Sequence, residues 1–368
     1  MKILVLQDFL RSGGTERQSI LLANAFAAAG HSSTLLTFRP GGALDSTVAR
    51  NVTRRALLPF DLRLDWFAPG LSSELRRYAP GVVLCMGRMA NCYGRRLQAG
   101  FPAIAVVATM RTGKTLPAPY LRSLSSVRHI VANSRDARDA LIHRYSIAPE
   151  KITVIHNALV FPSTSAIAPN PVSRAALRSA QGASSTTMVL LCVAMFRPEK
   201  NQRVLIETVA TLPPGLDWQL WLAGDGPARA ACEQLVASRQ LGSRVKFPGF
   251  HRNPSPLYEA ADVAVHASAS EALSNFLVEA QAHGLPAVVF QAQGMEECVV
   301  PNHTGWVIPR DDPAGYCAAL VRLAGEPSTT RAARSAAARA FARDNFDPRR
   351  QVAAYLELFQ RLLSRSAP

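Results

Sequence analysis

The sequence predicts an α/β protein of two domains, each built on a parallel sheet with helices on both faces. Apolar runs of strand length alternate with helical patterns throughout, which is typical of such sheets. The chain has 368 residues, which is too long for one ordinary core and fits two domains. Apolar residues make up 48% of the chain, so we expect a packed globular protein.

In the first half, a glycine pair follows the first predicted strand. Gly13 and Gly14 lead into a helix expected over 15–29, so the backbone can approach a ligand at a helix N-terminus. Their spacing is not GxGxxG, which weakens the case for a nicotinamide-binding fold. A plain turn between strand and helix is the alternative. The strands of this half are expected at 2–7, 33–38, 81–86, 103–109, 129–132 and 152–155.

The segment 54–80 mixes arginines with large apolar side chains such as Phe60, Trp66 and Phe67. It could contact an anionic membrane or a lipid-linked acceptor, or it could be a loop and helix that pack their apolar side on the domain. Residues 1–168 hold 21 Lys/Arg and 9 Asp/Glu, a net charge of +12, whereas 169–368 hold 20 and 17, a net charge of +3. The asymmetry indicates either an anionic partner for the first half or an excess of solvated arginine.

Residues 161–187 are rich in Pro, Ser, Ala and Thr, which predicts a linker followed by a short helix. We therefore expect a first domain over 1–165 and a second over 170–345. The last helix, with apolar side chains at helical spacing, is expected over 349–363. In the second half, strands are expected at 188–194, 218–223, 245–249, 262–266 and 287–290, and a late turn at 305–308.

The stretch 268–288 is the most informative part of the chain. It holds Glu271 and Glu279 with seven residues between them. Ser274 or Asn275 is expected to cap a helix that begins there, which places Glu279 in its second turn and Glu271 in the loop before it. Gly284 followed by Leu-Pro stops this helix. The loop therefore opens onto a helix N-terminus, which suits a phosphate.

Two cations lie in the loop after the strand 188–194. Arg197 and Lys200, three residues apart, can grip a diphosphate from two directions, although a surface turn is the alternative. The chain has no Asp-x-Asp motif, which is a common way to hold a divalent cation. We therefore expect no metal and no other cofactor.

The stretch 268–288 resembles the signature of the family-four retaining glycosyltransferases, in which Ser-x-x-Glu, seven residues and Glu-Ala precede Gly-Leu-Pro. The Arg197–Lys200 loop, the Gly224 turn and later segments resemble that family in order over about 120 residues, and the first half does so at the glycine pair. The resemblance implies the GT-B fold: two Rossmann-like domains facing a central cleft, with the last helix crossing back to the first domain. The second domain would bind a nucleotide-sugar and the first an acceptor.

The resemblance also implies roles for individual residues. Arg197 and Lys200 would stabilise the leaving diphosphate, Glu271 would contact the sugar, and Glu279 would bind the ribose. Arg111 stands about where many members have a histidine that contacts the sugar, so this role stays open. On the acceptor side, Asn133 and His156 would lie near Arg111, with a structural role as the alternative for His156. The remaining donor-side residues would be Gly13, Gly14, Gly224, Phe250, Arg252, Leu273, Ser274 and Asn275.

By this resemblance the protein is a retaining, metal-independent hexosyltransferase acting in polysaccharide biosynthesis. It would move a sugar from a nucleotide-sugar, with UDP expected, to a saccharide or lipid-linked acceptor. A non-transferring GT-B epimerase is one alternative, although such enzymes lack the Glu pair with its Gly-Leu-Pro stop. A non-catalytic sugar-nucleotide-binding protein is the other. No helix-turn-helix, zinc or RNA-binding signature is present, so no nucleic-acid partner is expected.

Several features favour a cytoplasmic location. The six cysteines show no CxxC and no spacing coupled to histidine, which is typical of reduced core residues. The segment 1–8 is expected to be a first strand and not a signal peptide. No apolar run approaches the ~18 residues of a spanning helix. Peripheral contact with the inner face of an anionic membrane stays open.

Overall fold

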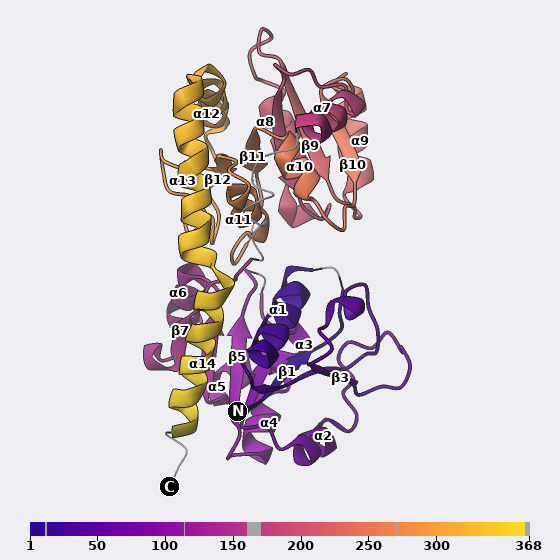
Figure 1. Cartoon of the computed structure of the whole chain (residues 1–368), viewed down its shortest axis with the longest axis vertical. Helices are drawn as coiled ribbons and strands as arrows, with labels where there is room; N and C mark the ends of the chain where they lie inside the picture. Colours follow the sequence, from indigo (N-terminus) through magenta and orange to yellow (C-terminus); the bar gives the residue numbers. More distant parts are fainter. Residues whose placement is uncertain (12, 114, 160–170, 270, 365–368) are drawn as a thin grey trace. The chain divides into compact units, whose positions relative to one another are not determined.

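A computed structural model describes residues 1–11, 13–113, 115–159, 171–269 and 271–364. The chain forms two compact units, one of Met1–Ala158 with Pro348–Pro368 and the other of Leu159–Asp347. Each unit is a parallel sheet with helices on both faces, which confirms the predicted fold class (Figure 1). The predicted linker falls mainly on residues 160–170, which lie outside the described residues.

The first unit has a seven-stranded sheet in the order β3-β2-β1-β4-β5-β6-β7, in which every pair is parallel. The edge strand β3 was not predicted, because its sequence Thr-Arg-Arg-Ala has no apolar run and it is only half buried. The other strands lie within a few residues of their expected positions. The bounds are β1 (Lys2–Gln7), β2 (Ser32–Thr37), β3 (Thr53–Ala56), β4 (Val82–Cys85), β5 (Ala105–Met110), β6 (His129–Ala132) and β7 (Ile152–Val154).

Helices cover this sheet in two groups. Buried side chains of α2 to α6 form one core, and those of α1 and α14 form the core on the other face. Tyr355 and Phe359 of α14 pack on Phe26 of α1, with ring centroids 6.3 and 5.7 Å apart, so the last helix belongs to the first unit. The bounds are α1 (Gly14–Ala28), α2 (Leu71–Tyr78), α3 (Arg88–Cys92), α4 (Gly94–Gly100), α5 (Ala118–Ser126), α6 (Arg135–His143) and α14 (Pro348–Ser364).

The second unit has a six-stranded parallel sheet in the order β10-β9-β8-β11-β12-β13. The expected turn at 305–308 is wrong: these residues form β13, which pairs with β12 from Ala287↔Gly305 to Phe290↔Ile308. Trp306, Val307 and Ile308 supply the β-forming side chains of this short edge strand. The bounds are β8 (Met188–Val193), β9 (Trp218–Ala223), β10 (Val245–Gly249), β11 (Val263–His266), β12 (Ala287–Phe290) and β13 (Gly305–Ile308).

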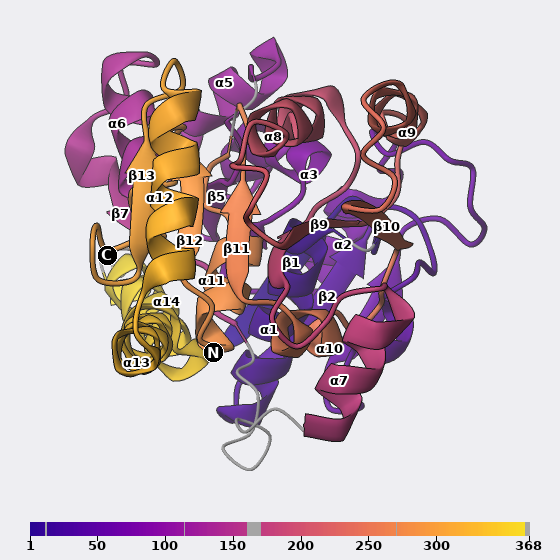
Figure 2. The same ribbon diagram turned by 90° about the horizontal axis from the view of Figure 1, so that it is seen from above.

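Figure 2 shows the helices of the second unit on the two faces of its sheet. Side chains of α8, α9 and α12 form the core on one face, and those of α10, α11 and the end of α13 form the core on the other. The bounds are α7 (Pro171–Ala180), α8 (Gln202–Val209), α9 (Arg229–Ser238), α10 (Ser255–Ala260), α11 (Asn275–Ala282), α12 (Pro313–Gly325) and α13 (Ser328–Phe346).

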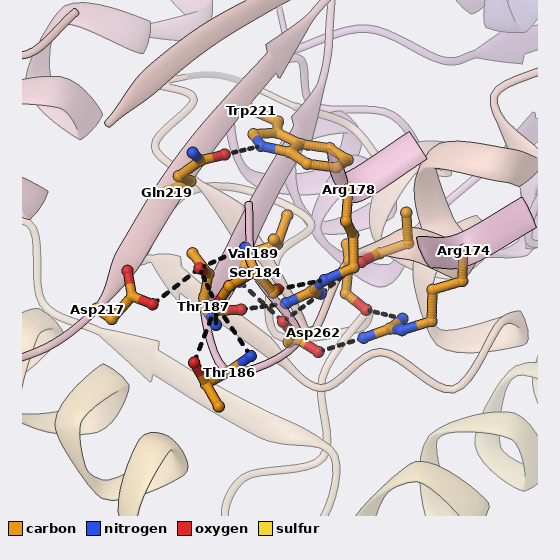
Figure 3. A network of polar contacts seen from close by, with 12 residues as sticks. Arg174, Arg178, Ser184, Thr186, Thr187, Val189, Asp217, Gln219, Trp221 and Asp262 are labelled. Carbon is orange, nitrogen blue, oxygen red and sulfur yellow. Dashed lines mark hydrogen bonds and ion pairs between the residues drawn. The ribbon is translucent and has the colours of Figure 1, made fainter. Parts of the chain in front are cut away.

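A buried polar network fastens α7 to the amino ends of β8 and β11 (Figure 3). Asp262 accepts hydrogen bonds from Arg174 at 2.6 Å, from Arg178 at 3.0 Å and from the Val189 amide at 2.8 Å. Arg178 is buried and also donates to the Ala260 carbonyl at 2.8 Å. Asp262 is paired with both arginines here, so removing either arginine or the carboxylate would leave a charge without its partner.

The order of the strands directs attention to the opposite edge. The chain runs outward from β8 to β9 and β10, then returns to continue from β11 to β12 and β13. In parallel sheets, ligands bind outside the carboxyl ends of the strands at such a reversal. The crevice between the loops that follow β8 and β11 is therefore the expected site of the second unit.

Candidate active site

Two loops meet at the carboxyl ends of β8 and β11. The carbonyl of Glu199, in the first loop, accepts the Ala269 amide at 2.7 Å and the Ser268 hydroxyl at 3.1 Å from the second. A short 3₁₀ turn over Pro198–Lys200 shapes the first loop. These bonds fix Arg197 and Lys200 beside the segment that leads to Glu271.

Glu271 is the centre of a polar cluster in this crevice. Lys200 Nζ donates to Glu271 Oε1, and His266 Nε2 lies 3.1 Å from the same oxygen. Burial raises the pKa of Glu271, but the hydrogen bond from His266 and the charge of Lys200 outweigh it and lower the pKa to about 2. The carboxylate is therefore ionised at neutral pH, even though little of it is exposed.

The tautomer of His266 follows from its neighbours. Burial lowers the pKa of His266, so its ring is neutral at pH 7. Burial also raises the pKa of the Cys192 thiol to about 12, and its Sγ lies 3.7 Å from His266 Nδ1. The thiol keeps its proton and donates it to Nδ1, which leaves the proton of the ring on Nε2 to donate to Glu271. His266 thus positions the carboxylate without adding charge.

Arg197 stands apart from this cluster. It directly precedes the 3₁₀ turn, and its side chain is exposed. Within the described ranges, the guanidinium makes no hydrogen bond and no ion pair. The two predicted phosphate cations therefore lie on one loop in different states, with Lys200 held by Glu271 and Arg197 open to solvent.

The Gly224 turn packs directly on this loop. Gly224 follows β9 with a φ of 141°, and a Cβ there would lie 2.0 Å from the Ala194 carbonyl oxygen. The Phe196 amide donates to the Asp225 carbonyl at 2.9 Å. Only glycine allows this approach, so the turn helps to fix the backbone on which Arg197 lies.

The expected cap position of α11 is confirmed, but the expected capping hydrogen bond is absent. Ser274 stands at the N-cap position, but its side chain makes no capping hydrogen bond, and Asn275 is the first helical residue. Ser274 has extended backbone, with a ψ of 100°, and its side chain is buried. Leu273 is also buried. The stop is as predicted, since Gly284 has a φ of 87° after the helix.

Glu279 lies in the second turn of α11, as expected, and has a partner that the sequence did not suggest. Tyr258 Oη donates to Glu279 Oε2 at 2.7 Å. The Tyr258 ring stacks on His283, with centroids 5.0 Å apart. Helices α10 and α11 together orient this carboxylate. Phe250 and Arg252, which follow the edge strand β10, are exposed.

The predicted residues of the first unit lie at the carboxyl ends of their strands. Arg111 follows β5, donates to Asn157 Oδ1 and, at 2.9 Å, to Tyr355 Oη of α14. Asn133 follows β6 and is buried, with Oδ1 unpartnered among the described residues. The His156 carbonyl accepts Gln351 Nε2 of α14 at 2.8 Å. Arg111 and His156 thus both help to dock α14.

The glycine pair opens α1 as expected. Gly13 is its N-cap residue and Gly14 its first helical residue. A Cβ at Gly13 would lie 2.5 Å from Glu16 Oε2, the end of a flexible side chain. Its backbone is extended, with a φ of −78°, and needs no left-handed conformation.

Two further observations concern possible binding sites. No group of three or more His, Cys, Asp or Glu that could hold a metal ion occurs among the described residues. A cavity of about 700 Å³ lies at the amino ends of β8, β11 and β12, lined by residues such as Arg174, His283 and Arg339. It is at the edge of the sheet opposite the Glu271 cluster, so it is not the predicted donor site.

Two parallel sheets, each with a strand-order reversal, make the chain a two-unit α/β protein of the doubly wound class. The comparisons agree. The profile described as Glycosyl transferases group 1 matches residues 187–326, and the profile described as Glycosyltransferase Family 4 matches residues 12–159. Together the two cover well over half of the chain. The chain therefore belongs to this glycosyltransferase family.

Individual relatives extend the comparison. The lipopolysaccharide core biosynthesis glycosyltransferase LpsD of Rhizobium meliloti is 28% identical over 367 residues, 98% of each chain. The D-inositol 3-phosphate glycosyltransferase of Streptomyces coelicolor is 28% identical over 258 residues, 63% of this chain and 56% of its own. The crystal structure of Anabaena HepE in complex with UDP-glucose has a TM-score of 0.82 and 22% identity, and covers 98% of this chain and 99% of its own. This likeness shows the GT-B fold.

Proposed function

We propose that the protein is a retaining hexosyltransferase that moves a sugar from a UDP-sugar to a saccharide or lipid-linked saccharide acceptor. The observation that carries the proposal is the Lys200–Glu271–His266 cluster, which lies at the strand-order reversal of the second unit. The choice of UDP is supported by the neighbouring HepE structures, which hold UDP and UDP-glucose. The relative from Rhizobium meliloti supports a role in building a cell-surface glycan.

The chemical task is to break an anomeric C–O bond whose leaving group is a nucleoside diphosphate. Negative charge grows on the diphosphate in the transition state, and fixed donors stabilise it better than water because they need no reorganisation. Arg197, exposed on its loop, and Lys200 supply positive charge. The N-terminus of α11 adds its dipole. These groups act without a metal, and we propose that the enzyme needs none.

Glu271 and Glu279 take the two sugars of the donor. The ionised Glu271 orients Lys200 and accepts hydrogen bonds from hydroxyls of the transferred sugar. Glu279, held by Tyr258, accepts hydrogen bonds from the ribose. Retention follows if the acceptor attacks the face from which the diphosphate departs, with the diphosphate itself as base. No protein nucleophile is then needed.

The reaction is proposed to take place in the cytoplasm, where nucleotide-sugars are made. No helix of the described part of the chain is long and apolar enough to span a membrane. A lipid-linked acceptor would therefore have to be reached from the membrane surface.

UDP release tests the proposal. The protein is incubated with a panel of UDP-sugars, with and without saccharide and lipid-linked acceptors. A transferase releases UDP in proportion to acceptor and extends the acceptor by one sugar. An epimerase changes the configuration of the sugar in the absence of acceptor and extends no acceptor, whereas a binding protein leaves the UDP-sugar unchanged. Either of the last two results would overturn the proposal.

A further inference from the structure

The loop between β3 and α2 can be followed in Figure 1. It carries four large apolar side chains that stay partly exposed. Phe60, Leu62, Trp66 and Phe67 are 62%, 42%, 57% and 37% exposed, and we call them the apolar tip. Leu58, just before them, is buried. The sequence left open whether this segment packs its apolar side on the domain, and for these four side chains it does not. Exposed apolar side chains gathered on one loop mark an interaction site.

The acidic side chains of the same loop are used for attachment. Asp61 accepts two hydrogen bonds from Arg39, at 2.6 and 2.7 Å. Asp65 bridges Arg39 at 2.6 Å and Arg11 at 2.5 Å. Arg39 is buried, and its guanidinium lies over the Phe9 ring, 4.0 Å from the centroid. The carboxylates of this loop therefore bind arginines of the domain, whereas its apolar side chains are exposed to solvent. An ordinary surface loop shows the reverse arrangement.

Backbone contacts fix the shape of this loop. Arg63 has a left-handed φ of 58°, and its amide donates to Asp61 Oδ1 at 2.8 Å. The Trp66 carbonyl accepts Tyr93 Oη at 2.6 Å. The rings of Trp66 and Phe67 lie 5.9 Å apart. The tip is thus presented in one arrangement, which lowers the entropy cost of burying it in a partner.

The attachment points place the tip at a functional edge of the first sheet. Phe9 and Arg11 follow β1, and Arg39 follows β2, so all three lie at carboxyl ends of strands. The glycine pair Gly13 and Gly14 is part of the same β1–α1 connection. Under the proposed function, this is the edge at which the first unit receives its acceptor.

The charge around the tip fits an anionic surface. Residues 50–96 hold nine arginines and three carboxylates, an excess of six positive charges. Some of these charges are already paired: Arg54 with Asp45 at 2.8 Å, and Arg77 with Glu74 at 2.6 Å. Exposed arginines that make no ion pair with any described residue remain, and they are Arg50, Arg63, Arg76, Arg88, Arg95 and Arg96.

We propose that the apolar tip inserts into the interfacial layer of an anionic bilayer and that the arginines around it bind the lipid headgroups. Aromatic side chains suit the boundary between headgroups and acyl chains, and basic side chains near an anionic leaflet add attraction. Binding to the bilayer is inferred from the exposed apolar side chains and from the excess of positive charge. Delivery of a lipid-linked acceptor to the first sheet rests on the proposed function.

Trp66 provides a direct probe, because it is much more exposed than the buried Trp218 and Trp221 and the half-buried Trp306. The full chain is mixed with phosphatidylglycerol vesicles or with neutral phosphatidylcholine vesicles. We expect a blue shift of tryptophan emission and quenching by brominated acyl chains with the anionic vesicles. Trp66→Phe should keep vesicle binding and lose most of the shift. Raising salt to about 0.5 M should weaken binding, because the headgroup contacts are screened.

Co-sedimentation tests the tip itself. Phe60→Ser combined with Trp66→Ser should lower binding to anionic vesicles at least about tenfold. Val321→Ser, which changes an exposed apolar residue on α12 of the second unit, should leave it unchanged. Equal binding of wild type and the double variant overturns the proposal, as does an unshifted emission. A dimer in the absence of vesicles that the double variant abolishes would instead assign the tip to a second copy of the chain.

UDP affinity is measured on the same samples to keep this inference separate from the proposed function. The double variant should bind UDP as the wild type does, because the tip lies in the other unit from the Glu271 cluster. Vesicle binding without UDP binding would refute the proposed function but would support the proposed membrane contact. UDP binding without vesicle binding would refute the membrane contact but would leave the proposed function standing.

Discussion

Glu271 is kept ionised while nearly removed from water. A carboxylate buried without donors takes up a proton. Here Lys200 supplies charge and His266 supplies a neutral hydrogen-bond donor, and the pKa falls to about 2. The cluster therefore offers a charged hydrogen-bond acceptor at neutral pH, and the proposed function assigns this acceptor to hydroxyls of the transferred sugar.

The pH dependence of stability tests this arrangement. The folded-state pKa of Glu271 is lower than its ordinary value of 4.5, so its contribution to stability is present above about pH 4.5 and is lost as pH falls towards 2. The shift corresponds to at most about 3 kcal/mol. In urea unfolding, the difference in the free energy of unfolding between wild type and Glu271→Gln should be larger at pH 7 than at pH 3. An equal gap at both pH values would contradict the assigned ionisation.

Glu279 should govern donor affinity. Glu279→Ala leaves the ribose hydroxyls without their acceptor, at a cost of ~1–3 kcal/mol, so UDP affinity should fall roughly ten- to a hundredfold. Tyr258→Phe removes only the hydroxyl that orients the carboxylate, so it should lower UDP affinity less than Glu279→Ala does. Calorimetric titration with UDP measures both. Unchanged affinity in Glu279→Ala, with the fold intact, would refute the ribose assignment.

Sequence motifs located the two glutamates and the two cations, but not the residues that hold them. His266 is five residues before Glu271 and Tyr258 is 21 before Glu279, and both contacts depend on how strands and helices pack. His266 did carry a signal, because a histidine at the carboxyl end of a predicted buried strand points to the ligand edge of a parallel sheet. Tyr258 carried none.

At the scale of elements, the site is a product of short loops packed tightly on one another. The loop after β8 is fixed by Ala269 and Ser268 on one side and by the Gly224 turn on the other. Bonds to backbone atoms dominate these contacts. The position of Arg197 and Lys200 thus depends on loop geometry as much as on their own side chains.

Gly224→Ala should disturb this geometry. A Cβ at 2.0 Å from the Ala194 carbonyl oxygen, on a backbone with a φ of 141°, forces the β8 loop to move. We expect a loss of stability of about 2–4 kcal/mol together with weaker UDP binding. Gly215→Ala is the matched control, since its Cβ would meet open space. Thermal unfolding and UDP titration are measured for both variants. If the two variants behave alike, the Gly224 turn tolerates a side chain and the prediction is wrong.

Most strands followed from the sequence because they are continuous apolar runs buried on both faces. The exceptions are edge strands. In β3 arginines replace the apolar run, and β13 is four residues long and begins with glycine. The capping hydrogen bond of Ser274 is also absent, although Ser274 stands at the predicted cap position. Sequence patterns predict the centre of a sheet better than its edges or its helix ends.

At the scale of the whole molecule, charge and chemistry are divided between the two units. The Glu pair and the two cations lie in the second unit, and the apolar tip with its arginines lies in the first. This division fits an enzyme that binds a small charged donor with one domain and a surface-borne acceptor with the other. It also explains why motifs are concentrated in the second half, since a shared donor chemistry constrains residues more than varied acceptors do.

Independence from metal ions is a property expected of the complete enzyme. In the proposed mechanism, Arg197, Lys200 and the start of α11 take the electrostatic role that a divalent cation has in other transferases. Sugar transfer should therefore persist in excess EDTA. A loss of activity that magnesium or manganese restores would contradict this mechanism.

The phosphate clamp is the central claim, and a double-mutant cycle on it is the most direct test. Arg197→Ala and Lys200→Ala are each measured for UDP-sugar turnover, then combined. Each change should lower kcat/KM by about 10² or more, because both cations oppose charge that develops in the transition state. The combined loss should be smaller than the product of the two, since they share one diphosphate. Normal turnover in both single variants would contradict the account.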